Sequence, residues 1–537
     1  MTVFRSSIDT SSALFKRNTD EMIRLTERLA ELNDRGARVS DRKREKFHAR
    51  NQLLPRERLA HLLDPGMPFL TIGNLSGYML DTDKEERSVP GSTIIAGIGF
   101  VSGRRCVITV DDSAISAGAI KAGSAYRFMR CEQIALDQKL PFIHLVESAG
   151  GDLKNYLVEG FVQYGAIFAN LARLSAAGVP TIAALHGSST AGGAYMPGLS
   201  DYVVAVRERG KAFLAGPPLL KAATGEIADD ETLGGAEMHS DISGLADHLA
   251  NDDAEAIRTV REIVERLPNN VEQTPRTFKK PVHDEQELLG VVPPDYRTPY
   301  DVREVIARIV DGSDFTDFKE RIGPATVCVF ANIMGIPCGI LSNNGPIDNP
   351  GAHKATQFLQ LCESAGTPVV FLQNTTGYMV GVETERGGMI KNGSKMIQAV
   401  ANISVPRITL QIGASFGAGN YGMCGRGFDP DFCFTWPNAM TGVMGGEQAG
   451  KVMRIVAEQS AEAKGEEPNA EMLAFQEAAL KHVFDSQADA FTTSGRNLDD
   501  GMIDPRDTRR VLGFLLETVR EGRKRETKRN SFGIARM

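Results

Sequence analysis

Hydrophobic residues fall into short runs of strand length along much of this chain, separated by longer stretches of helical pattern. Two such runs, Ser92–Val101 and Arg105–Val110, flank a turn at Gly103 and predict a β-hairpin. A predicted helix, residues 119–138, then leads to the apolar run Phe142–Val146, which predicts a buried strand. Strands that alternate with helices in this way indicate layered α/β structure.

The same alternation continues through the first half of the chain. It predicts a helix that ends near residue 176, a strand at Thr181–Leu185 and another strand at Tyr202–Val206. A polar helix over residues 252–266 closes this half, and the pattern starts again near Val327.

A long sequence pattern occurs twice, in the same order. The segment Val179–Tyr195 recurs without a gap as Val405–Tyr421, and upstream of it Leu140–Gly151 is echoed by Thr367–Gly377. The identities in the longer pair include Pro180 with Pro406, Gly187 with Gly413, Ser189 with Ser415, Gly193 with Gly419 and Tyr195 with Tyr421. Because solenoid repeats run to roughly 20 to 50 residues, this longer period indicates a duplicated domain.

Composition supports a folded protein with two large domains. Of the 537 residues, 42% are hydrophobic and 24% are charged, which gives no reason to expect disorder. A prior of about 150 residues per domain would give three or four domains, but the duplication favours two. The segment Pro268–Thr298 has the proline content of a linker, so we expect domains at residues 1–280 and 281–537.

The net charge and the cysteines indicate which binding partners and which cellular compartment to expect. The formal net charge of -8 disfavours nucleic acid as the main partner, although a local basic patch stays possible. The seven cysteines form no Cys-x-x-Cys pair, and neither a secretory signal nor 18 consecutive apolar residues occurs. We therefore expect a cytoplasmic protein without membrane contact. The nine histidines form no cluster, and we predict no metal.

Each loop that follows a core strand is rich in small residues. These loops are Glu147–Gly151, Gly187–Ala194, Asn374–Gly377 and Gly413–Asn420. Glycine lets the backbone approach a ligand closely, and the first N–H groups of a following helix are unpaired and can bind an anion. One such oxyanion donor lowers a reaction barrier by roughly 2.7 to 4 kcal/mol, so these loops predict a site with few titratable side chains. Alternatively, the glycines only permit tight packing of helix on strand.

Three common motifs are matched incompletely. Residues 445–451 have P-loop spacing, but Val452 stands where a hydroxyl should reach Mg²⁺. Residues 417–422 match the dinucleotide pattern, which lacks the acidic residue expected about 20 positions later. Ser415 occupies a nucleophile-elbow pattern, and the only later histidine is His482, so a catalytic triad stays a minor alternative.

Two further features have both a structural and a functional interpretation. His186 precedes its glycine-rich loop on an apolar strand and is more often a hydrogen-bonded core residue than a ligand. Residues 10–63 predict charged helices, with basic stretches at Asp41–Arg50 and Pro55–Arg58. These cations form either a solvated helix face or a contact with an anionic ligand, and the sequence does not decide between the two.

Together, the motifs resemble the carboxyltransferase (β) subunit of biotin-dependent acyl-CoA carboxylases, within the crotonase-like superfamily. The resemblance covers essentially the whole chain. Its matching stretches are Leu62–Phe69, Thr190–Tyr195, Ala215–Glu226, Leu233–Glu237, Pro299–Glu304, Phe416–Arg426 and Val443–Gln448. It implies an α/β fold of two duplicated crotonase-like (ββα spiral) domains.

Within the family, the chain is most similar to the branch that acts on 3-methylcrotonyl-CoA and geranyl-CoA. Asn374–Gly381 and Gly417–Met423 differ from what propionyl-CoA and acetyl-CoA enzymes usually show. Asp152–Tyr164 departs from the methylcrotonyl pattern, and Ala169 stands about where a bulky aromatic residue is expected. A roomier acyl pocket would follow, which favours geranyl-CoA or a similar branched acyl chain as substrate.

The resemblance also implies roles for individual residues. The N-terminal half would bind acyl-CoA and the C-terminal half biotin, with the active site between domains of different subunits. Backbone amides of the catalytic residues Gly192, Gly193, Ala418 and Gly419 would stabilise the thioester dienolate and the biotin ureido oxygen, with the assignment of loop to oxyanion left open. The implied substrate-binding residues are Gly150, Gly151, Ala169, Thr190, Ala191, Ala194 and Tyr195; the implied biotin-binding residues are Thr376, Gly377, Tyr378, Phe416, Gly417, Asn420 and Tyr421.

The implied chemistry places the base and the cofactor outside this chain. Carboxybiotin would release CO2, and the biotin anion would take the γ-proton, which explains the absence of a side-chain base. The chain lacks the Met-Lys-Met biotinylation motif, so a separate α subunit would supply biotin carboxylase and biotin carrier within an α6β6 assembly built on a β6 hexamer. The alternatives are a 3-methylcrotonyl-CoA carboxylase β subunit, a biotin-dependent decarboxylase subunit and a non-enzymatic assembly scaffold.

Overall fold

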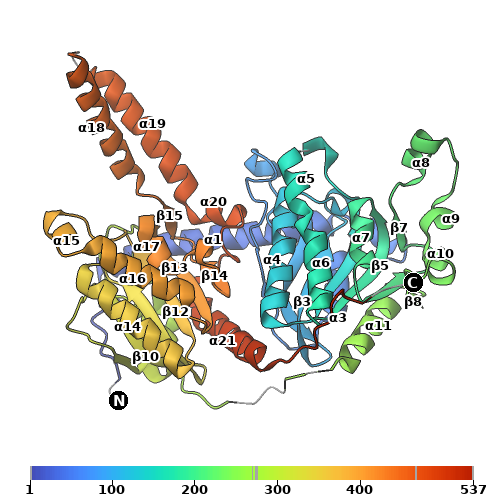
Figure 1. Ribbon diagram of the computed structural model, residues 1–537, viewed down its shortest axis with the longest axis horizontal. Helices are drawn as coiled ribbons and strands as arrows, with labels where there is room; N and C mark the ends of the chain where they lie inside the picture. The colour runs from blue at the N-terminus through green and yellow to red at the C-terminus, as the bar shows by residue number, and fades with distance from the viewer. Residues whose placement is uncertain (1–2, 156, 269, 272–275, 466–468, 535–537) are drawn as a thin grey trace. The chain divides into compact units, whose positions relative to one another are not determined.

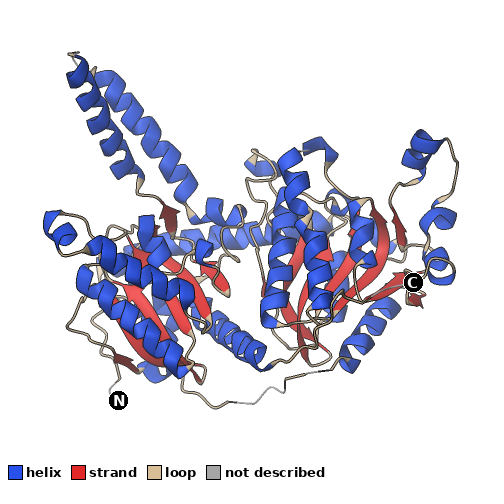
Figure 2. Cartoon of the chain, in the orientation of Figure 1, coloured by secondary structure: helices blue, strands red, loops and turns tan. Residues whose placement is uncertain are grey.

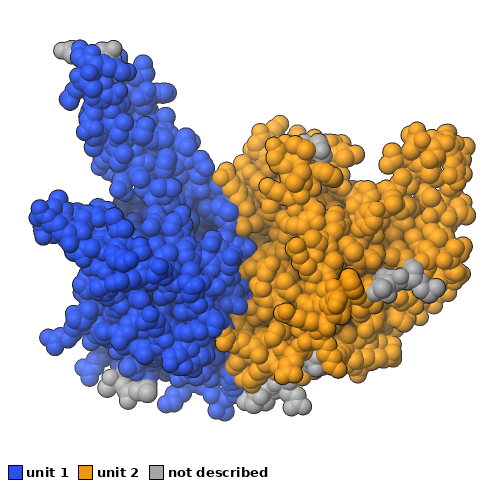
Figure 3. Space-filling model, viewed as in Figure 1, with its two compact units in different colours: residues 1–30, 275–494, 498–517 blue, residues 31–274, 495–497, 518–537 orange. Residues whose placement is uncertain are grey.

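The computed structural model describes residues 3–155, 157–268, 270–271, 276–465 and 469–534. The chain divides into two compact units, coloured separately in Figure 3. Unit 1 comprises residues 1–30, 275–494 and 498–517, and unit 2 comprises residues 31–274, 495–497 and 518–537. Part of the expected linker Pro268–Thr298, residues 269 and 272–275, lies outside the described residues.

Unit 2 contains a mixed sheet in which the order of strands is β1-β2-β3-β4-β5-β6-β8, with β7 paired to β5 (Figures 1 and 2). The first three strands are antiparallel, and the sheet is parallel from β3 onward. The predicted hairpin is confirmed as β2 and β3. The strands are β1 (Leu70–Thr71), β2 (Ile94–Val101), β3 (Arg104–Asp111), β4 (Phe142–Ser148), β5 (Thr181–Thr190), β6 (Tyr202–Val206), β7 (Lys211–Phe213) and β8 (His248–Ala250).

Helices cover both faces of this sheet because its strands are apolar on both sides. On β4, Ile143 and Leu145 pack in one core cluster with residues of α3 and α11. The alternate residues Phe142 and His144 face Phe128 of α4, with ring centroids 5.4 and 4.9 Å away. The described helices of unit 2 are α2 (Arg44–His48), α3 (Pro55–Leu62), α4 (Ala122–Gln138), α5 (Val158–Tyr164), α6 (Ala166–Ala176), α7 (Gly192–Gly198), α8 (Pro217–Thr224), α9 (Asp230–Gly234), α10 (Ala236–Asp241) and α11 (Asp253–Arg266).

Unit 1 repeats the topology of unit 2. Its strand order is β14-β13-β12-β11-β10-β9, with β15 paired to β13, so β10 to β15 correspond in order to β2 to β7. The expectation of a duplicated α/β domain is confirmed. The strands are β9 (Phe315–Asp317), β10 (Thr326–Ile333), β11 (Ile336–Asn343), β12 (Val369–Thr375), β13 (Arg407–Phe416), β14 (Phe432–Thr435) and β15 (Met440–Gly442).

Two helices of unit 1, α14 and α16, bury Phe358, Leu359 and Met396 against Phe371 of the sheet in one core cluster. The described helices are α12 (Leu288–Val291), α13 (Arg303–Ile309), α14 (Asn349–Ala365), α15 (Val382–Arg386), α16 (Met389–Asn402), α17 (Gly417–Gly422), α18 (Gly446–Lys464), α19 (Ala470–Ala488) and α20 (Ala490–Gly495). Helices α1 (Ala13–Asp41) and α21 (Thr508–Lys524) contain residues of both units, as does α20, whose last residue Gly495 belongs to unit 2.

Several predicted features are confirmed, and the glycine-rich loops differ from prediction. The polar helix begins at Asp253 as α11, because Asp252 caps it by accepting from the N–H of Glu255 at 2.8 Å. All seven cysteines are buried. Strand β5, however, continues through Gly187 to Thr190, a stretch that its glycine and serine content predicts as loop. Within the described part of the chain, no helix is long and apolar enough to span a bilayer.

A buried carboxyl group in unit 1 gives the fold a testable pH dependence. Asp499 accepts hydrogen bonds from Ser494 Oγ at 2.8 Å and the N–H of Gly501 at 2.9 Å. Burial nevertheless dominates and raises the pKa of Asp499 from 3.8 to about 7. As the pH falls from 7 toward 4, the folded protein binds a proton that the unfolded chain does not, so this group makes the fold more stable at lower pH.

We expect Asp499→Asn to stabilise the protein at pH 8 and to have a smaller effect at pH 5, since asparagine removes the cost of burying a charge. Thermal unfolding of both proteins between pH 5 and 8 measures this difference. A difference in midpoint that stays the same at every pH would contradict the raised pKa.

Candidate functional site

A one-residue turn joins β5 to α7 in unit 2. β5 ends at Thr190 and α7 begins at Gly192. Between them, Ala191 has φ 55° and ψ -122°, a conformation that L-residues rarely adopt, and its N–H donates to the carbonyl of Phe213 on β7 at 3.0 Å. The chain therefore reverses from a strand into a helix within one strained and exposed residue.

The N–H groups of Gly192 and Gly193 are available at this turn. Among the described residues, neither group has an acceptor, as expected for the first turn of a helix. Gly193 is buried, and a Cβ there would lie 2.9 Å from Ser189 Oγ, so only glycine fits without displacement. The turn thus presents two adjacent donors beside a buried backbone, which is the arrangement that binds an oxyanion.

The loop after β4 lies directly against this turn. Gly150 has φ 84°, and a Cβ on it would stand 2.9 Å from the carbonyl oxygen of Thr190. Its own carbonyl accepts from the N–H of Ile120 at 2.7 Å, and Gly151 forms a bridge with the same residue. The structure thus brings the predicted residue Gly150 against Thr190 and Ala191, whereas Gly151 follows it in the chain and pairs with Ile120.

Aromatic side chains stand beside the turn, and one of them was not predicted. Tyr195, a predicted residue, is 51% exposed, and its ring lies 6.1 Å from that of Phe168 on α6. A Cβ on Gly192 would lie 3.3 Å from the Phe168 ring. Ala169 is partly exposed on the same helix. Phe168 was not predicted from the sequence, although this residue borders the buried stripe formed by Ile167, Leu171 and Leu174.

Unit 1 contains the equivalent turn from β13 into α17. Phe416 precedes the helix in an extended conformation, and Gly417 has φ 55°. In the described ranges, the N–H groups of Ala418 and Gly419 have no acceptor. A Cβ on Gly419 would approach Gly377 Cα to 2.8 Å, so this turn also packs on the glycine of a neighbouring loop.

The side chains predicted to bind biotin mostly hold this turn together. Tyr378 is partly buried beside Gly422, and burial raises the pKa of its hydroxyl group. Asn420 Nδ2 donates to Ser415 Oγ at 2.7 Å, and the ring of Phe416 packs 5.1 Å from Tyr296. Exposed positions are Thr376 and Tyr421, the latter at 51%, the same value as Tyr195.

The incomplete motifs have structural roles instead. Ser415 is fully buried and donates to Gln373 Oε1 at 2.5 Å. Residues 445–451 start helix α18, and Lys451 pairs with Glu447 at 2.7 Å. Neither arrangement provides an activated nucleophile or a phosphate-binding loop.

The basic stretch Pro55–Arg58 is partly buried, contrary to the interpretation as a solvated face. Arg58 has 1% of its side chain exposed and pairs with Glu147 Oε2 at 2.5 Å. Its position could have been found from the sequence, because Leu54, Arg58 and Leu62 follow one another at helical spacing on a single face. Arg44, in contrast, is exposed and pairs with Asp41 and Glu57.

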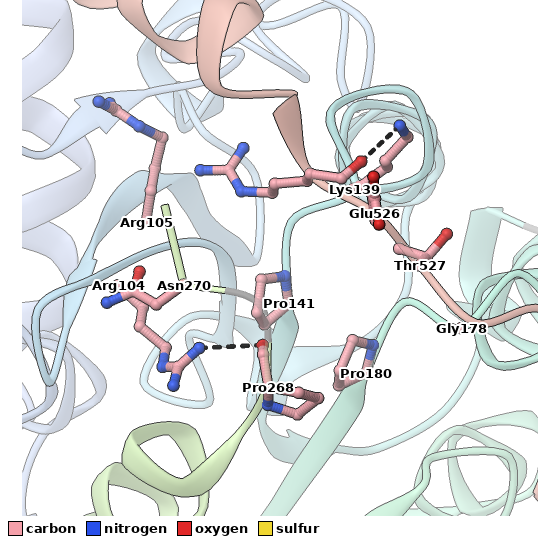
Figure 4. A pocket seen from close by; sticks show the side chains of 11 residues that line it. Arg104, Arg105, Lys139, Pro141, Gly178, Pro180, Pro268, Asn270, Glu526 and Thr527 are labelled. Atoms are coloured by element: carbon pink, nitrogen blue, oxygen red, sulfur yellow. Dashed lines mark hydrogen bonds between the residues drawn. The ribbon is translucent and has the colours of Figure 1, made fainter. Parts of the chain in front are cut away.

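A solvent-open pocket of unit 2 lies at the other end of the same sheet (Figure 4). Pro141 and Pro180 in its wall directly precede β4 and β5, whereas the glycine turns follow these strands. Its cations are engaged: Lys139 Nζ donates to the carbonyl of Arg525 at 2.7 Å, and Arg104 to that of Pro268 at 3.1 Å. These contacts anchor the C-terminal segment, so the pocket is not part of the candidate site.

A strand, a glycine-rich turn and a helix with available N–H groups, present in two copies, suit an enzyme that stabilises oxyanions. The chain belongs to the carboxyl transferase domain family, whose model matches residues 46–532. The family comprises the carboxyltransferase components of biotin-dependent acyl-CoA carboxylases, and both the predicted family and the crotonase-like fold are confirmed.

Known relatives cover almost the whole chain. The chain is 49% identical over 496 residues to the probable biotin-dependent acyl-coenzyme A carboxylase beta2 subunit of Mycobacterium tuberculosis, covering 92% of each. It is 43% identical over 514 residues to the 3-methylcrotonyl-coenzyme A carboxylase beta1 subunit of the same organism, covering 94% of this chain and 96% of the relative. The crystal structure of the P. aeruginosa geranyl-CoA carboxylase beta subunit matches with a TM-score of 0.93 and 50% identity, covering 100% of both chains.

The contact between Gly150 and Thr190 can be tested with a matched pair of glycines. Gly150→Ala places a Cβ 2.9 Å from a carbonyl oxygen at positive φ, whereas a Cβ on Gly151 meets no atom within 4 Å. Strain of about 1 to 3 kcal/mol should lower the thermal midpoint by about 2 to 4 °C per kcal/mol in Gly150→Ala alone. Equal midpoints for the two variants in thermal unfolding would contradict the close approach of the two loops.

Proposed function

We propose that this chain moves a carboxyl group from carboxybiotin to the γ-carbon of a branched α,β-unsaturated acyl-CoA, with geranyl-CoA or a similar thioester favoured. The observation that supports this most is the pair of turns, at Ala191 and Gly417, each followed by two N–H groups that have no acceptor among the residues the structure describes. Two oxyanions develop in such a transfer, one on the thioester and one on the ureido group. Each turn can stabilise one of them.

In unit 2, the thioester oxygen would accept hydrogen bonds from Gly192 and Gly193. Charge on this oxygen grows as the γ-carbon loses its proton, so the two donors stabilise the transition state more than the bound substrate. Their positions are set by the backbone alone, which costs no reorganisation during the reaction. Gly150, Gly151, Thr190, Ala194, Tyr195 and Ala169 would surround the acyl group.

In unit 1, the N–H groups of Ala418 and Gly419 would hold the ureido oxygen of biotin. The residues fit such a ring, because Gly419 lets two backbones come together where its own Cβ would stand 2.8 Å from Gly377 Cα. Carboxybiotin supplies the carboxyl group and, after its loss, the base. This chain's part would be to bind the oxygen and to exclude water, and exposed Tyr421 would cover the ring.

The surface of α5 supports a long apolar acyl chain. This helix follows Gly151 closely in the chain, and it exposes Val158, Phe161 and Val162 by 56%, 71% and 70%. Apolar side chains this exposed mark a ligand or protein contact rather than a solvated surface. The P. aeruginosa geranyl-CoA carboxylase beta subunit, which is 50% identical in sequence to this chain over the full length of both, adds to this support.

A partner must supply the biotin. We place the chain in a β6 hexamer within an α6β6 assembly, with biotin carboxylase and the biotin carrier on the α subunit, in the cytoplasm. The beta-subunit names of the relatives support such a partner.

The substrate assignment is tested by ATP-dependent fixation of labelled bicarbonate with the biotinylated partner present. We expect kcat/KM to be highest for geranyl-CoA, lower for 3-methylcrotonyl-CoA and lowest for propionyl-CoA, because the exposed apolar surface suits a longer chain. A preference for 3-methylcrotonyl-CoA would instead assign the chain to a 3-methylcrotonyl-CoA carboxylase. Activity with none of the three substrates would overturn the proposed reaction.

The role of the Gly192 N–H is tested by Gly192→Pro against Gly192→Ala. Both variants add a Cβ near Phe168, but only proline, which is favoured at the first helical position, removes the donor. We expect kcat of the proline variant to be about 100- to 1000-fold below that of the alanine variant, the usual cost of one oxyanion donor. Equal kcat values in the bicarbonate assay would show that this N–H is not a donor to the reacting oxygen.

A further inference from the structure

Strand β5 contains a register shift immediately before the turn at Ala191. Leu185 pairs with Val146 of β4, and the next pair joins Ser189 to Ser148, so residues 186–188 of β5 face a single residue of β4. Extra residues of this kind bend a strand and re-aim its end. The direction in which β5 delivers Thr190, and hence the N–H groups of α7, therefore depends on how this bulge is held.

Four side chains from four elements hold the bulge. Arg58 of α3 donates to Glu147 Oε2 of β4 at 2.5 Å, and its Nε lies 3.4 Å from Asp253 Oδ2 of α11. Asp253 Oδ1 lies 2.7 Å from Nδ1 of His186, the first residue of the bulge. Arg58, Asp253 and His186 are all at most 1% exposed. The chain of contacts thus runs from β4 to β5 through two helices.

Glu147 transmits any movement directly to the bulge. Its carboxyl group covers Gly187, where a Cβ would lie 2.6 Å from Glu147 Cδ. Its N–H donates to Asp111 Oδ2 at 3.0 Å, which fixes its backbone. A shift of this side chain must therefore displace either Arg58 or Gly187.

The surroundings shift the pKa values of two members of this network, His186 and Asp253. Burial lowers the pKa of His186, with the charge of Arg58 acting in the same direction, so a neutral imidazole donates from Nδ1 to Asp253. Burial opposes ionisation of Asp253, but the hydrogen bond and charges of its neighbours outweigh it and lower its pKa to about 2.

The network is poorly built for stability alone. Nε and Nη2 of Arg58 and Nε2 of His186 are buried and make no hydrogen bond in the part of the chain that the structure describes. Leaving such groups unsatisfied costs free energy, and an apolar core of the same shape would often be more stable. Charges that are kept here although they are incompletely paired therefore indicate that the network serves to fix the geometry of the bulge.

Unit 1 holds its equivalent bulge without charge. Gln373 pairs with Gln411, and the next pair is Thr375 with Ser415, the same shift at the same place. There, Asn374 covers Gly413, with Oδ1 2.4 Å from where a Cβ would lie, and Ile412 is a buried apolar residue. A carboxylate–arginine–carboxylate–histidine set is therefore particular to unit 2 among the two copies.

We infer that Arg58, Glu147, Asp253 and His186 act as positioning residues that set the placement of the Gly192 and Gly193 N–H groups for the thioester oxygen. This inference rests on the proposed assignment of that turn to acyl-CoA. None of the four needs to touch substrate, because each acts through the bulge. A misplacement of about 1 Å can lower a rate by about 100-fold, so the network need move the donors only slightly to matter.

The test is Glu147→Gln, which keeps the shape of the side chain and removes its charge. The matched control is Glu521→Gln, since Glu521 is a buried carboxylate of the same unit paired with Arg105 at 2.9 and 3.0 Å, at the opposite end of the sheet. Both are assayed with the biotinylated partner for kcat and KM of acyl-CoA, for thermal midpoint, and for biotin-dependent ATP turnover without acyl-CoA.

We expect Glu147→Gln to lower kcat by about 10- to 100-fold with KM and acyl-CoA-independent ATP turnover unchanged, and Glu521→Gln to leave kcat unchanged at a similar loss of thermal midpoint. If Glu147→Gln fails to fold, His186→Ile takes its place in the test. It copies Ile412 of unit 1, and we expect it to lower kcat in the same way.

Two outcomes would overturn the positioning role. In one, kcat falls in every variant, including Glu521→Gln, in proportion to the loss of thermal midpoint. In the other, kcat is unchanged in Glu147→Gln and His186→Ile. Failure of the proposed function is distinct, because then wild-type protein fixes no bicarbonate on the acyl-CoA or Gly192→Pro retains the kcat of Gly192→Ala.

Discussion

Backbone N–H groups that the fold leaves without partners are the constraint on which the rest of this structure depends. A helix cannot satisfy its first N–H groups internally, and here both α7 and α17 begin directly after a core strand. The surrounding features follow from this requirement. Glycines at 193 and 419 allow the close packing, strained Ala191 reverses the chain within one residue, and the flanking loops leave the donors accessible.

Using backbone N–H groups as the hydrogen-bond donors separates oxyanion binding from side-chain identity. The two units share strand order, register shift and turn, yet they differ at several side chains around the turn. His186 of one unit corresponds to Ile412 of the other, and Glu147 to Asn374. In the proposed function, a duplicated backbone therefore serves two different oxyanions, and the neighbouring side chains would select which molecule brings each one.

Much of the fold could be predicted from the sequence because the relevant signals are local. The hairpin at Gly103, the strand at Phe142 and the cap at Asp252 each depend on residues within a few positions. The end of β5 could not be predicted in this way. Its Gly-Ser-Ser content is typical of a loop, but the pairing of Ser189 with Ser148 keeps it in the sheet, and such pairing joins residues far apart in sequence.

The candidate site was predicted at its backbone positions and missed in its supporting side chains. Glycine placement revealed the turns, since few other residues fit there. Arg58, Glu147 and Asp253 lie far apart in the sequence, and no spacing rule joins them. Phe168 was not predicted, although it borders the apolar stripe of its helix, because the resemblance points only to its neighbour Ala169.

The seven buried cysteines give the two units separate chemical reporters. Burial raises the pKa of Cys106, Cys362 and Cys424 to about 12, so almost no thiolate exists in the closed protein at neutral pH. Alkylation must then wait for the surrounding core to open, and its rate measures that opening. Cys106 lies in unit 2 and Cys362 in unit 1. The alkylation rates of these two thiols would therefore show whether the two cores open independently or together.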